Sequence, residues 1–245
     1  MQIIISPAKT MVEDTDSLAP LSTPVFLDKA DTLLKELLKL DKKQLQVLYK
    51  CSEKIVDENF ERLKRINLNK ALTPALFAYQ GIQYQYMGAK VLEDGDYAYL
   101  QDNLSILSGF YGVLRPFDGV RAYRLEMGAK FKNVPFKDLY AYWRSDITSF
   151  LKAKDLRIVN LASLEYSKAI DLSQFEVVHV YFGHKKGDKI VEKGTVCKQA
   201  RGAMVKFLAN KQAQNFAVIK DFNELGFSYA DELSDDQHYY FVKEV

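Results

Sequence analysis

The stretch from Leu104 to Gly128 combines residue types that can bind an anion. It contains glycines and aromatic residues interleaved with three arginines, Arg115, Arg121 and Arg124. Glycines let a backbone approach a ligand, guanidinium groups match phosphate or carboxylate oxygens, and aromatic rings stack on bases or cations. These residues are therefore candidates for a binding loop. The alternative is a tight connection whose arginines pair with Asp118 and Glu126.

Further cationic candidates lie toward both ends of the chain. Lys9 follows a short apolar run, in the segment SPAKT. The spacing between Cys197 and Asn210 predicts a helix, with Lys198, Arg201 and Lys206 on the arc opposite its apolar residues. An ordinary solvated basic face is the alternative. We predict that the three loop arginines share one concave surface with Lys198 and Arg201, with Lys9 at its floor, because like charges that converge add their fields.

Three short apolar runs are each followed by small polar residues. These runs are residues 2–5, 104–107 and 157–161. In an open α/β sheet with parallel strands, the loops that follow the strands meet at one edge and form the ligand pocket. We therefore expect the segments SPAKT, LSGFYG and NLAS to form such a pocket. Its candidate orienting residues are Ser6, Ser108, Tyr111, Asn160 and Ser163.

The periodicity predicts one α/β (α+β) unit over residues 1–245, with a central mixed sheet and a helical insertion at roughly residues 27–87. Within the insertion, two helical stretches are separated by a break at Asp41-Lys42-Lys43. Another amphipathic helix is expected at 138–152, and Asp146 on its apolar face needs a polar partner. A β-hairpin is expected at 175–192.

Composition and charge limit the classes of function. The chain has 34 Lys and Arg against 32 Asp and Glu, so the formal net charge is only +2. The charge is uneven, however, with a local +6 over residues 184–211 (eight basic, two acidic) and −5 over residues 212–245 (two basic, seven acidic). This asymmetry predicts a polarised surface that attracts an anionic partner on one side. No stretch reaches the roughly 18 apolar residues of a membrane span.

The two cysteines indicate a reducing compartment, and we expect a cytoplasmic protein. Cys51 and Cys197 show no metal-ligand spacing with the three histidines, so neither a metal ion nor another cofactor is expected. Cys51 is predicted to lie inside a helix and to be inert. Cys197 adjoins Lys198, and it should be alkylated faster than Cys51 if the lysine charge lowers the pKa of its thiol.

Several segments carry a family resemblance. In chain order they are ISPAKT, SGFYGVLRPFD, YRLEMG, DLYAYWR, VNLAS and KQARG, and together they resemble the bacterial YaaA peroxide-stress family over nearly the whole chain. The resemblance implies a role in the hydrogen peroxide response, in limiting free iron and in protecting DNA. It also implies a helix-hairpin-helix DNA-binding element. The candidate positions are the link at residues 40–42, which lacks glycine, and the glycine-containing segment 107–112.

Three functions remain open. The favoured one is DNA binding, duplex or branched, through a positively charged cleft and largely without sequence readout, since phosphate contacts carry no base information. The phosphate-contacting candidates are Lys9, Arg115, Arg121, Arg124, Lys198, Arg201 and Lys206. The second is an enzyme acting on a nucleotide or nucleobase in the strand-end pocket, although no Walker loop or Gly-x-Ser-x-Gly elbow is present. The third, an iron- or haem-handling factor, has the least support, because Cys and His do not cluster.

Overall fold

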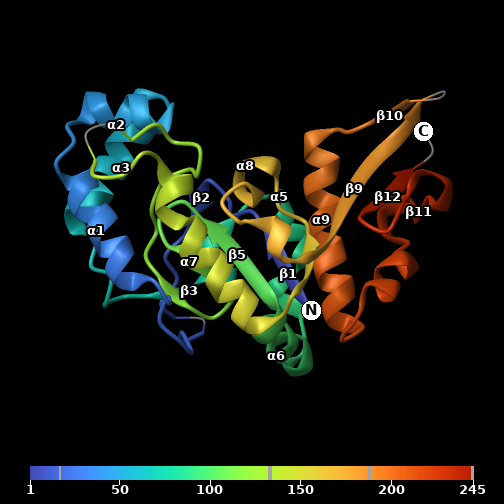
Figure 1. Ribbon diagram of the computed structural model, residues 1–245. Coiled ribbons are helices and arrows are strands. Elements are labelled where there is room, and N and C mark those ends of the chain that lie inside the picture. The colour runs from blue at the N-terminus through green and yellow to red at the C-terminus, as the bar shows by residue number, and fades with distance from the viewer. Residues whose placement is uncertain (17, 132–133, 187–188, 244–245) are drawn as a thin grey trace.

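The computed structural model describes residues 1–16, 18–131, 134–186 and 189–243 (Figure 1). The strands of its central sheet are β1 (Gln2–Ile5), β5 (Leu104–Ser108), β6 (Gly112–Leu114), β8 (Arg157–Asn160), β9 (Glu176–Lys186), β10 (Lys189–Val191), β11 (Ser228–Tyr229) and β12 (His238–Lys243). Their order is β11-β12-β9-β8-β1-β5-β6, with β10 paired to β9 outside this path. The predicted fold class, α/β with a central mixed sheet, is confirmed.

The three apolar runs that predicted strands are neighbours in this sheet and run parallel. β1 lies in the middle, and its Ile3 pairs with Leu104 of β5 on one side and with Val159 of β8 on the other. The parallel arrangement continues from β8 to β9 and from β9 to β12. The loops after β1, β5 and β8 therefore lie at the same edge of the sheet.

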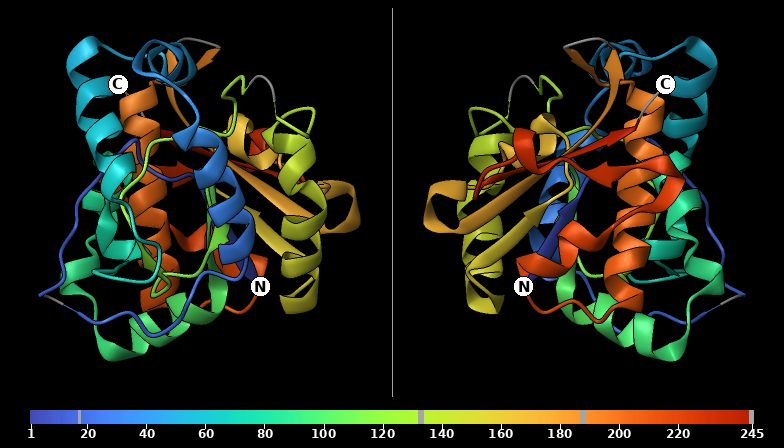
Figure 2. Two further views of the ribbon diagram at one scale, coloured as in Figure 1. Left: turned by 90° about the vertical axis from the view of Figure 1, so that its left-hand side faces the viewer. Right: turned by 90° about the vertical axis from the view of Figure 1, so that its right-hand side faces the viewer.

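The central strands are buried on both faces. Ile3, Ile4 and Ile5 expose none of their surface, which explains why this strand is continuously apolar instead of alternating. Helices α7 (Leu139–Lys154) and α9 (Gly194–Asn210) cover opposite faces of the sheet (Figure 2). Both helices occur where the periodicity predicted them, and the β9–β10 hairpin is also confirmed.

Trp143 of α7 holds the turn between β5 and β6. Gly112 has a φ of +76°, a conformation that favours glycine, and a Cβ added there would lie 2.7 Å from the indole ring. The Trp143 indole N–H donates to the carbonyl oxygen of Gly109 at 3.0 Å. Two separate sequence motifs, SGFYG and DLYAYWR, thus form one packed unit next to the C-terminal edge of the sheet.

Residues 27–87 contain five helices, α1 (Leu27–Leu38), α2 (Lys42–Tyr49), α3 (Glu53–Arg65), α4 (Ala75–Ala78) and α5 (Ile82–Met87). Two short strands, β3 (Thr73–Pro74) and β4 (Tyr79–Gln80), interrupt them and pair with β7 (Gly119–Val120) and β2 (Thr10–Met11). Lys29 of α1 forms an ion pair with Asp146 of α7, which is the polar partner that Asp146 was expected to need.

In the described ranges, the other helices are α6 (Asp94–Asn103), α8 (Leu164–Ser167) and the short 3₁₀ turns η1 (Ala89–Val91), η2 (Leu172–Gln174), η3 (Phe216–Asp221), η4 (Glu224–Gly226) and η5 (Asp231–Leu233). Among the described residues, no helix is both long and apolar enough to cross a membrane.

The helix-hairpin-helix prediction is not confirmed. Residues 107–112 join β5 to β6 in a β-hairpin, so the glycines there serve a turn between strands. The link at residues 40–42 does separate two helices, but Asp41 accepts a hydrogen bond from the backbone N–H of Gln44 at 2.8 Å. This N–H group at the start of α2 is therefore already used by a helix cap and is not free for a phosphate.

Candidate functional site

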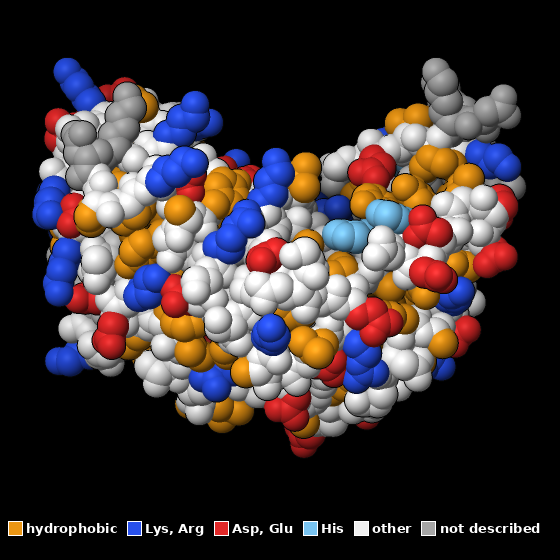
Figure 3. All heavy atoms as spheres, viewed as in Figure 1, with side chains coloured by type: hydrophobic (Ala, Val, Ile, Leu, Met, Phe, Trp, Pro, Cys, Tyr) orange, Lys and Arg blue, Asp and Glu red, His pale blue; other side chains and the backbone are white. Residues whose placement is uncertain are grey.

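A pocket of about 400 Å³ opens where β1 and β8 end. It is lined by residues 6–10, residues 80–84, residues 123–126, the three residues Ser163, Glu165 and Tyr166, and by Lys198 and Arg201 of α9. In Figure 1, α5, α8 and α9 lie between the α1–α3 helices and the β9–β10 hairpin. Figure 3 shows this side of the molecule hollowed, with Lys and Arg side chains along the hollow.

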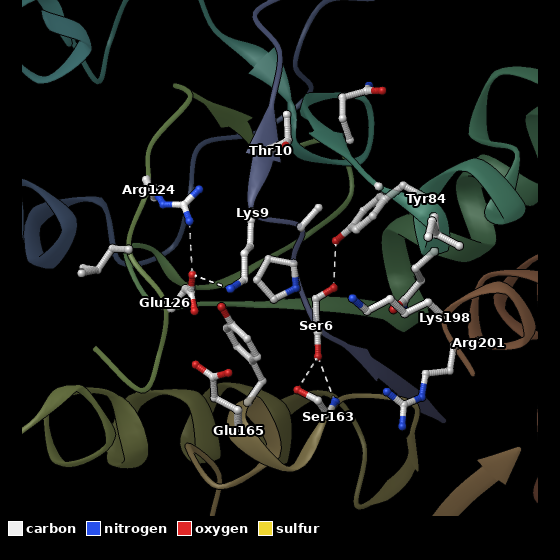
Figure 4. A pocket seen from close by; sticks show the side chains of 18 of the residues that line it. Ser6, Lys9, Thr10, Tyr84, Arg124, Glu126, Ser163, Glu165, Lys198 and Arg201 are labelled. Atoms are coloured by element: carbon white, nitrogen blue, oxygen red, sulfur yellow. Dashed lines mark hydrogen bonds and ion pairs between the residues drawn. The ribbon is translucent and has the colours of Figure 1, made fainter. Parts of the chain in front are cut away.

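Ser6 and Ser163 form the floor of the pocket (Figure 4). The Ser6 hydroxyl accepts a hydrogen bond from the backbone N–H of Ser163 at 2.9 Å and donates to the Ser163 hydroxyl at 3.2 Å. Tyr84 of α5 donates its hydroxyl proton to the carbonyl oxygen of Ser6 at 3.1 Å. These bonds fix the ends of two parallel strands and the start of α5 relative to one another.

One wall of the pocket carries two cations that share a carboxylate. Glu126 lies 3.0 Å from the Lys9 ammonium and 3.7 Å from the Arg124 guanidinium. Gly109 lets this segment approach the sheet, because a Cβ there would lie 2.5 Å from the carbonyl oxygen of Leu125. The positive charge of this wall is therefore partly neutralised.

The opposite wall, from α9, carries cations that form no close ion pair with the described residues, although the charge of Glu192 acts on Arg201. Within the described ranges, Lys198 and Arg201 form neither an ion pair nor a hydrogen bond through their side chains. Arg201 is half-buried, and burial lowers its pKa, although an arginine still stays charged at neutral pH. Figure 4 shows both side chains extending from α9 beside Ser6.

Three buried donor atoms around the pocket have no hydrogen-bond partner among the described residues. They are Nε of Arg124, Nε of Arg201 and Nε2 of Gln83, and all three side chains line the pocket. A buried donor without an acceptor costs free energy, so native structures rarely contain one without a reason. Three in one place indicate a site for a ligand that offers several acceptor atoms.

The tyrosines of the pocket are donors and not bases. Burial raises the pKa of Tyr123 to about 12, and burial also raises the pKa of Tyr84 and of Tyr166. Their hydroxyl groups therefore keep their protons at neutral pH. This adds to the donor character of the site and favours an acceptor-rich, anionic ligand.

The structure brings together four of the seven predicted cations, Lys9, Arg124, Lys198 and Arg201. Arg115 lies elsewhere, because β6 runs antiparallel to β5 and carries it to the opposite edge of the sheet. There it pairs with the fully buried carboxylate of Asp118 at 2.8 Å. The prediction that Arg115 shares one surface with α9 is wrong for this reason.

Arg121 and Lys206 also lie outside the pocket. Arg121 pairs with Glu13 at 3.0 Å and donates to the carbonyl oxygens of Lys70 and Ala71 at 3.2 and 3.0 Å. It faces a separate depression lined by residues of α3, so its predicted place on the common surface is wrong too. Lys206 is on α9, two turns beyond Lys198, and does not line the pocket.

Of the predicted orienting residues, Ser6 and Ser163 line the pocket, whereas Ser108, Tyr111 and Asn160 lie behind it. The Ser108 hydroxyl accepts from the backbone N–H of Tyr111 at 2.8 Å and contacts the Tyr123 hydroxyl at 2.6 Å. The Tyr111 hydroxyl accepts from the backbone N–H of Arg121 at 3.0 Å. The side-chain oxygen of Asn160 accepts a hydrogen bond from the backbone N–H of Ala162 at 3.0 Å. These three side chains shape the loops that form the site.

Sequence reasoning missed several pocket residues. Glu126 was considered only as an ion-pair partner, and Glu165, two residues after the NLAS segment, was not considered. Gln83 and Tyr84 belong to α5, within the helical insertion, and no local pattern connects α5 with the strand ends. Only the tertiary packing of α5 beside α9 brings them into the site.

The two cysteines differ from expectation. Cys197 is buried and its thiol donates to the carbonyl oxygen of Phe182 at 3.2 Å. Burial raises the pKa of this thiol, so the condition for faster alkylation of Cys197, a pKa lowered by Lys198, is not met. Cys51 lies in the link between α2 and α3, not inside a helix. Among the described residues, no group of three or more His, Cys, Asp or Glu is placed to hold a metal ion.

Comparisons with known proteins agree on one family. The family model described as peroxide stress protein YaaA matches residues 1–233. A UPF0246 protein of Desulfitobacterium hafniense (strain Y51) is 46% identical over 246 residues, covering 99% of this chain and 98% of the relative. UPF0246 proteins of Lachnoclostridium phytofermentans and Agathobacter rectalis are 44% and 42% identical, over 99% and 100% of this chain and 96% and 100% of their own lengths. The chain therefore belongs to the peroxide stress protein YaaA family.

Proposed function

We propose that this protein acts in the cytoplasmic response to peroxide stress by binding DNA at the positively charged pocket, largely without sequence readout. The family supports a role in peroxide stress. The observation that carries DNA binding is the set of donors without acceptors, which Arg124, Arg201 and Gln83 contribute to one pocket. A phosphate group supplies acceptor oxygens for these unpaired donors and a negative charge that attracts the two arginines.

The charge of the pocket favours the same ligand. Its lining holds four Lys and Arg side chains against the two carboxylates of Glu126 and Glu165, a formal balance of +2. The hollowed face around it carries further Lys and Arg side chains (Figure 3), which suits an extended phosphate backbone. Bound in this way, the protein would shield DNA from damage by hydrogen peroxide and free iron.

Charge removal tests this proposal. Lys198→Gln and Arg201→Gln should weaken binding to two duplexes of equal length and unrelated sequence alike. Each lost phosphate contact should lower the slope of log affinity against log salt concentration by about 0.9. Fluorescence anisotropy over a salt series measures both quantities.

Lys211→Gln is the matched control, because it removes the same charge at the C-terminal end of α9, outside the pocket. It should leave the slope unchanged. The proposal fails if the Lys198 and Arg201 variants bind like the natural protein, or if only one of the two sequences is affected.

An enzyme acting on a nucleotide or nucleobase is the second candidate, and the carboxylates of Glu126 and Glu165 beside the unpaired donors favour it. Such a pocket would bind a mononucleotide with little salt dependence. Titration calorimetry with nucleoside monophosphates at two salt concentrations separates the candidates. Tight, salt-insensitive binding of a mononucleotide together with weak duplex binding would favour the enzyme.

A further inference from the structure

Four ring side chains form a stacked group on one face of β9 and β12. His179 is the register partner of His238, and Tyr181 is the partner of Tyr240. The ring centroids lie 5.6 Å apart in the histidine pair and 4.9 Å apart in the tyrosine pair, with interplanar angles of 16° and 18°. Tyr181 also stacks with His238 at 6.1 Å. We call these four residues the ring stack.

The ring stack is the half-exposed side of this part of the sheet. The alternate residues Val178, Val180 and Phe182 are buried and belong to the face covered by α9, whereas His179 and Tyr181 are only half-buried. Figure 3 shows histidine side chains at the surface on the side where β9 and β12 lie in Figure 1. Cross-strand ring pairs stabilise a sheet without any ligand. A role of the ring stack in ligand binding therefore has to be argued from its position relative to the pocket.

The sheet register places the ring stack beside the pocket. Ile4 of β1, Asn160 of β8 and His179 of β9 are neighbours in one row. β8 ends at Asn160, so Tyr181, two residues farther along β9, has no β8 neighbour on the side away from Tyr240. Ser6, on the floor of the pocket, likewise lies two residues beyond Ile4. Tyr181 therefore lies at the edge of the sheet where the pocket opens, between the end of β8 and the start of the β10 pairing at His184, although it is not itself a pocket-lining residue.

Electrostatics connect the two features. Arg201 and Tyr181 lie close enough to affect each other: burial lowers the pKa of Arg201 and raises that of Tyr181, and in each case the partner opposes the shift. At the other end of the stack, Asp235 lies 2.9 Å from Nδ1 of His238 and repels a phosphate there. Of the two ends of the stack, the Arg201 end is therefore the one that offers a cation to a phosphate, although the carboxylate of Glu192 acts on both Arg201 and Tyr181 and offsets part of that charge.

We infer that the ring stack is a binding site for an unpaired DNA base, which stacks on the outer face of Tyr181 while the adjoining phosphate occupies the pocket at Arg201. Parallel rings at stacking distance extend most readily by one more flat ring, and every base has such a face. The inference rests on the proposed DNA binding. It specifies that the protein recognises an unpaired base in addition to the phosphate backbone.

Abasic DNA separates stacking from phosphate binding. A single strand and an abasic strand with the same number of phosphates are compared by anisotropy with the natural protein, and we expect about tenfold tighter binding of the strand with bases. Tyr181→Leu should abolish this preference, and Tyr181→Phe should keep it because the ring remains. The fluorescent base analogue 2-aminopurine in the single strand should be quenched by the natural protein and by Tyr181→Phe, but not by Tyr181→Leu.

The control is Tyr229→Leu on β11. Tyr229 pairs with Phe241, whose side chain is buried, so it belongs to the opposite face of the sheet. This variant should keep the preference for bases. Equal affinity of the natural protein for both strands, or an unchanged preference in Tyr181→Leu, would overturn the base site while leaving duplex binding intact. Absence of binding to duplex and single strands alike would overturn both the base site and the proposed function.

Discussion

Arg115 and Asp118 form an ion pair that closes the turn after β6. Nε and Nη2 of Arg115 donate to Oδ1 of Asp118 at 3.0 and 2.8 Å, and Asp118 exposes none of its surface. The Ser22 hydroxyl donates to the same carboxylate oxygen at 2.6 Å. A buried carboxylate needs these partners, because an unpaired charge away from water is strongly unfavourable. The role of Arg115 is therefore structural.

Arg115→Ala should destabilise the protein by about 3 kcal/mol, since it leaves a buried carboxylate without its cation. The DNA affinity of the folded fraction should not change, because Arg115 lies at the sheet edge opposite the pocket. Urea unfolding measures the first effect and anisotropy the second. The double variant Arg115→Ala/Asp118→Asn should recover part of the stability, because it also removes the uncompensated charge. A large loss of DNA affinity with unchanged stability would contradict this role.

The residue types of the candidate site could be predicted from the sequence, but their ion-pair partners only in part. Arg115 has Asp118 three residues later, and the sequence already offered this pair as an alternative. Arg201 has no acidic residue near it in the chain, since none occurs between Lys193 and Lys211. In the described part of the fold Arg201 forms no ion pair, and only the more distant charge of Glu192 acts on it. Whether an arginine forms an ion pair was therefore better predicted by acidic residues close to it in the sequence than by the number of arginines in a segment.

At the scale of elements, the contact between α5 and α9 builds one side of the pocket. Gly202 on α9 makes it possible, because a Cβ there would lie 2.1 Å from the carbonyl oxygen of Gln83 and 3.0 Å from the backbone nitrogen of Met87. Gln83 and Tyr84 line the pocket from this position. The glycine of the KQARG segment is therefore a helix-packing residue that places α5 next to Lys198 and Arg201.

Gly202→Ala should push α5 away from α9. Alanine is the better helix former, but the clash is with backbone atoms that cannot rotate away, so we expect a net destabilisation of about 1–3 kcal/mol and weaker DNA binding through the displaced Gln83. Gly194→Ala is the control at the first residue of α9, where an added Cβ meets nothing within 4 Å. Thermal unfolding and anisotropy of both variants decide the point. Natural-like stability and binding of Gly202→Ala would show that α5 does not depend on this contact.

This contact could not be predicted from periodicity. On a helical wheel, residues 197–210 separate into a basic arc and an apolar arc, which predicts one buried face. In the structure α9 is buried over more of its circumference than this apolar arc, and Gly202 and Val205 are among its buried residues. A helix that packs against both a sheet and a second helix has two buried faces, whereas the amphipathic pattern predicts only one. The short α5 also gave no signal of its own, because its place depends on a partner more than 100 residues away.

At the scale of the whole molecule, the sheet order was the part most open to prediction. Buried strands followed by small polar residues imply parallel neighbours, and the order β8-β1-β5 agrees with this. The long β9 and the late parallel β12 extend the sheet beyond this group and carry the ring stack. That extension followed from no local pattern, since β12 pairs with β9 across about 60 residues of chain and each pairing of this kind depends on the rest of the fold.

The charge asymmetry of the chain leads to a prediction about association rates. The acidic C-terminal segment supplies Asp236, which is exposed and lies two residues before His238 of the ring stack. At an ionic strength of about 0.01 M the Debye length is near 30 Å, so this charge repels approaching DNA from a distance, whereas near 0.15 M it falls to about 8 Å. A unit charge at a separation on the order of 10 Å changes the interaction energy in water by about 0.4 kcal/mol, which is about twofold in rate.

Asp236→Asn should therefore raise the association rate constant for single-stranded DNA about twofold at about 0.01 M salt and leave it unchanged near 0.15 M, with no effect on dissociation at either salt. Stopped-flow anisotropy measures both rates. Asp94→Asn is the control: it removes an exposed charge at the start of α6, which lies at the bottom of the molecule in Figure 1, whereas the hollow opens at the top of the same view in Figure 3. A twofold rise that persists at the higher salt, or that occurs equally in Asp94→Asn, would contradict this prediction. The electrostatic field of the protein would then not direct DNA to the ring stack and the pocket, and DNA would approach from another side.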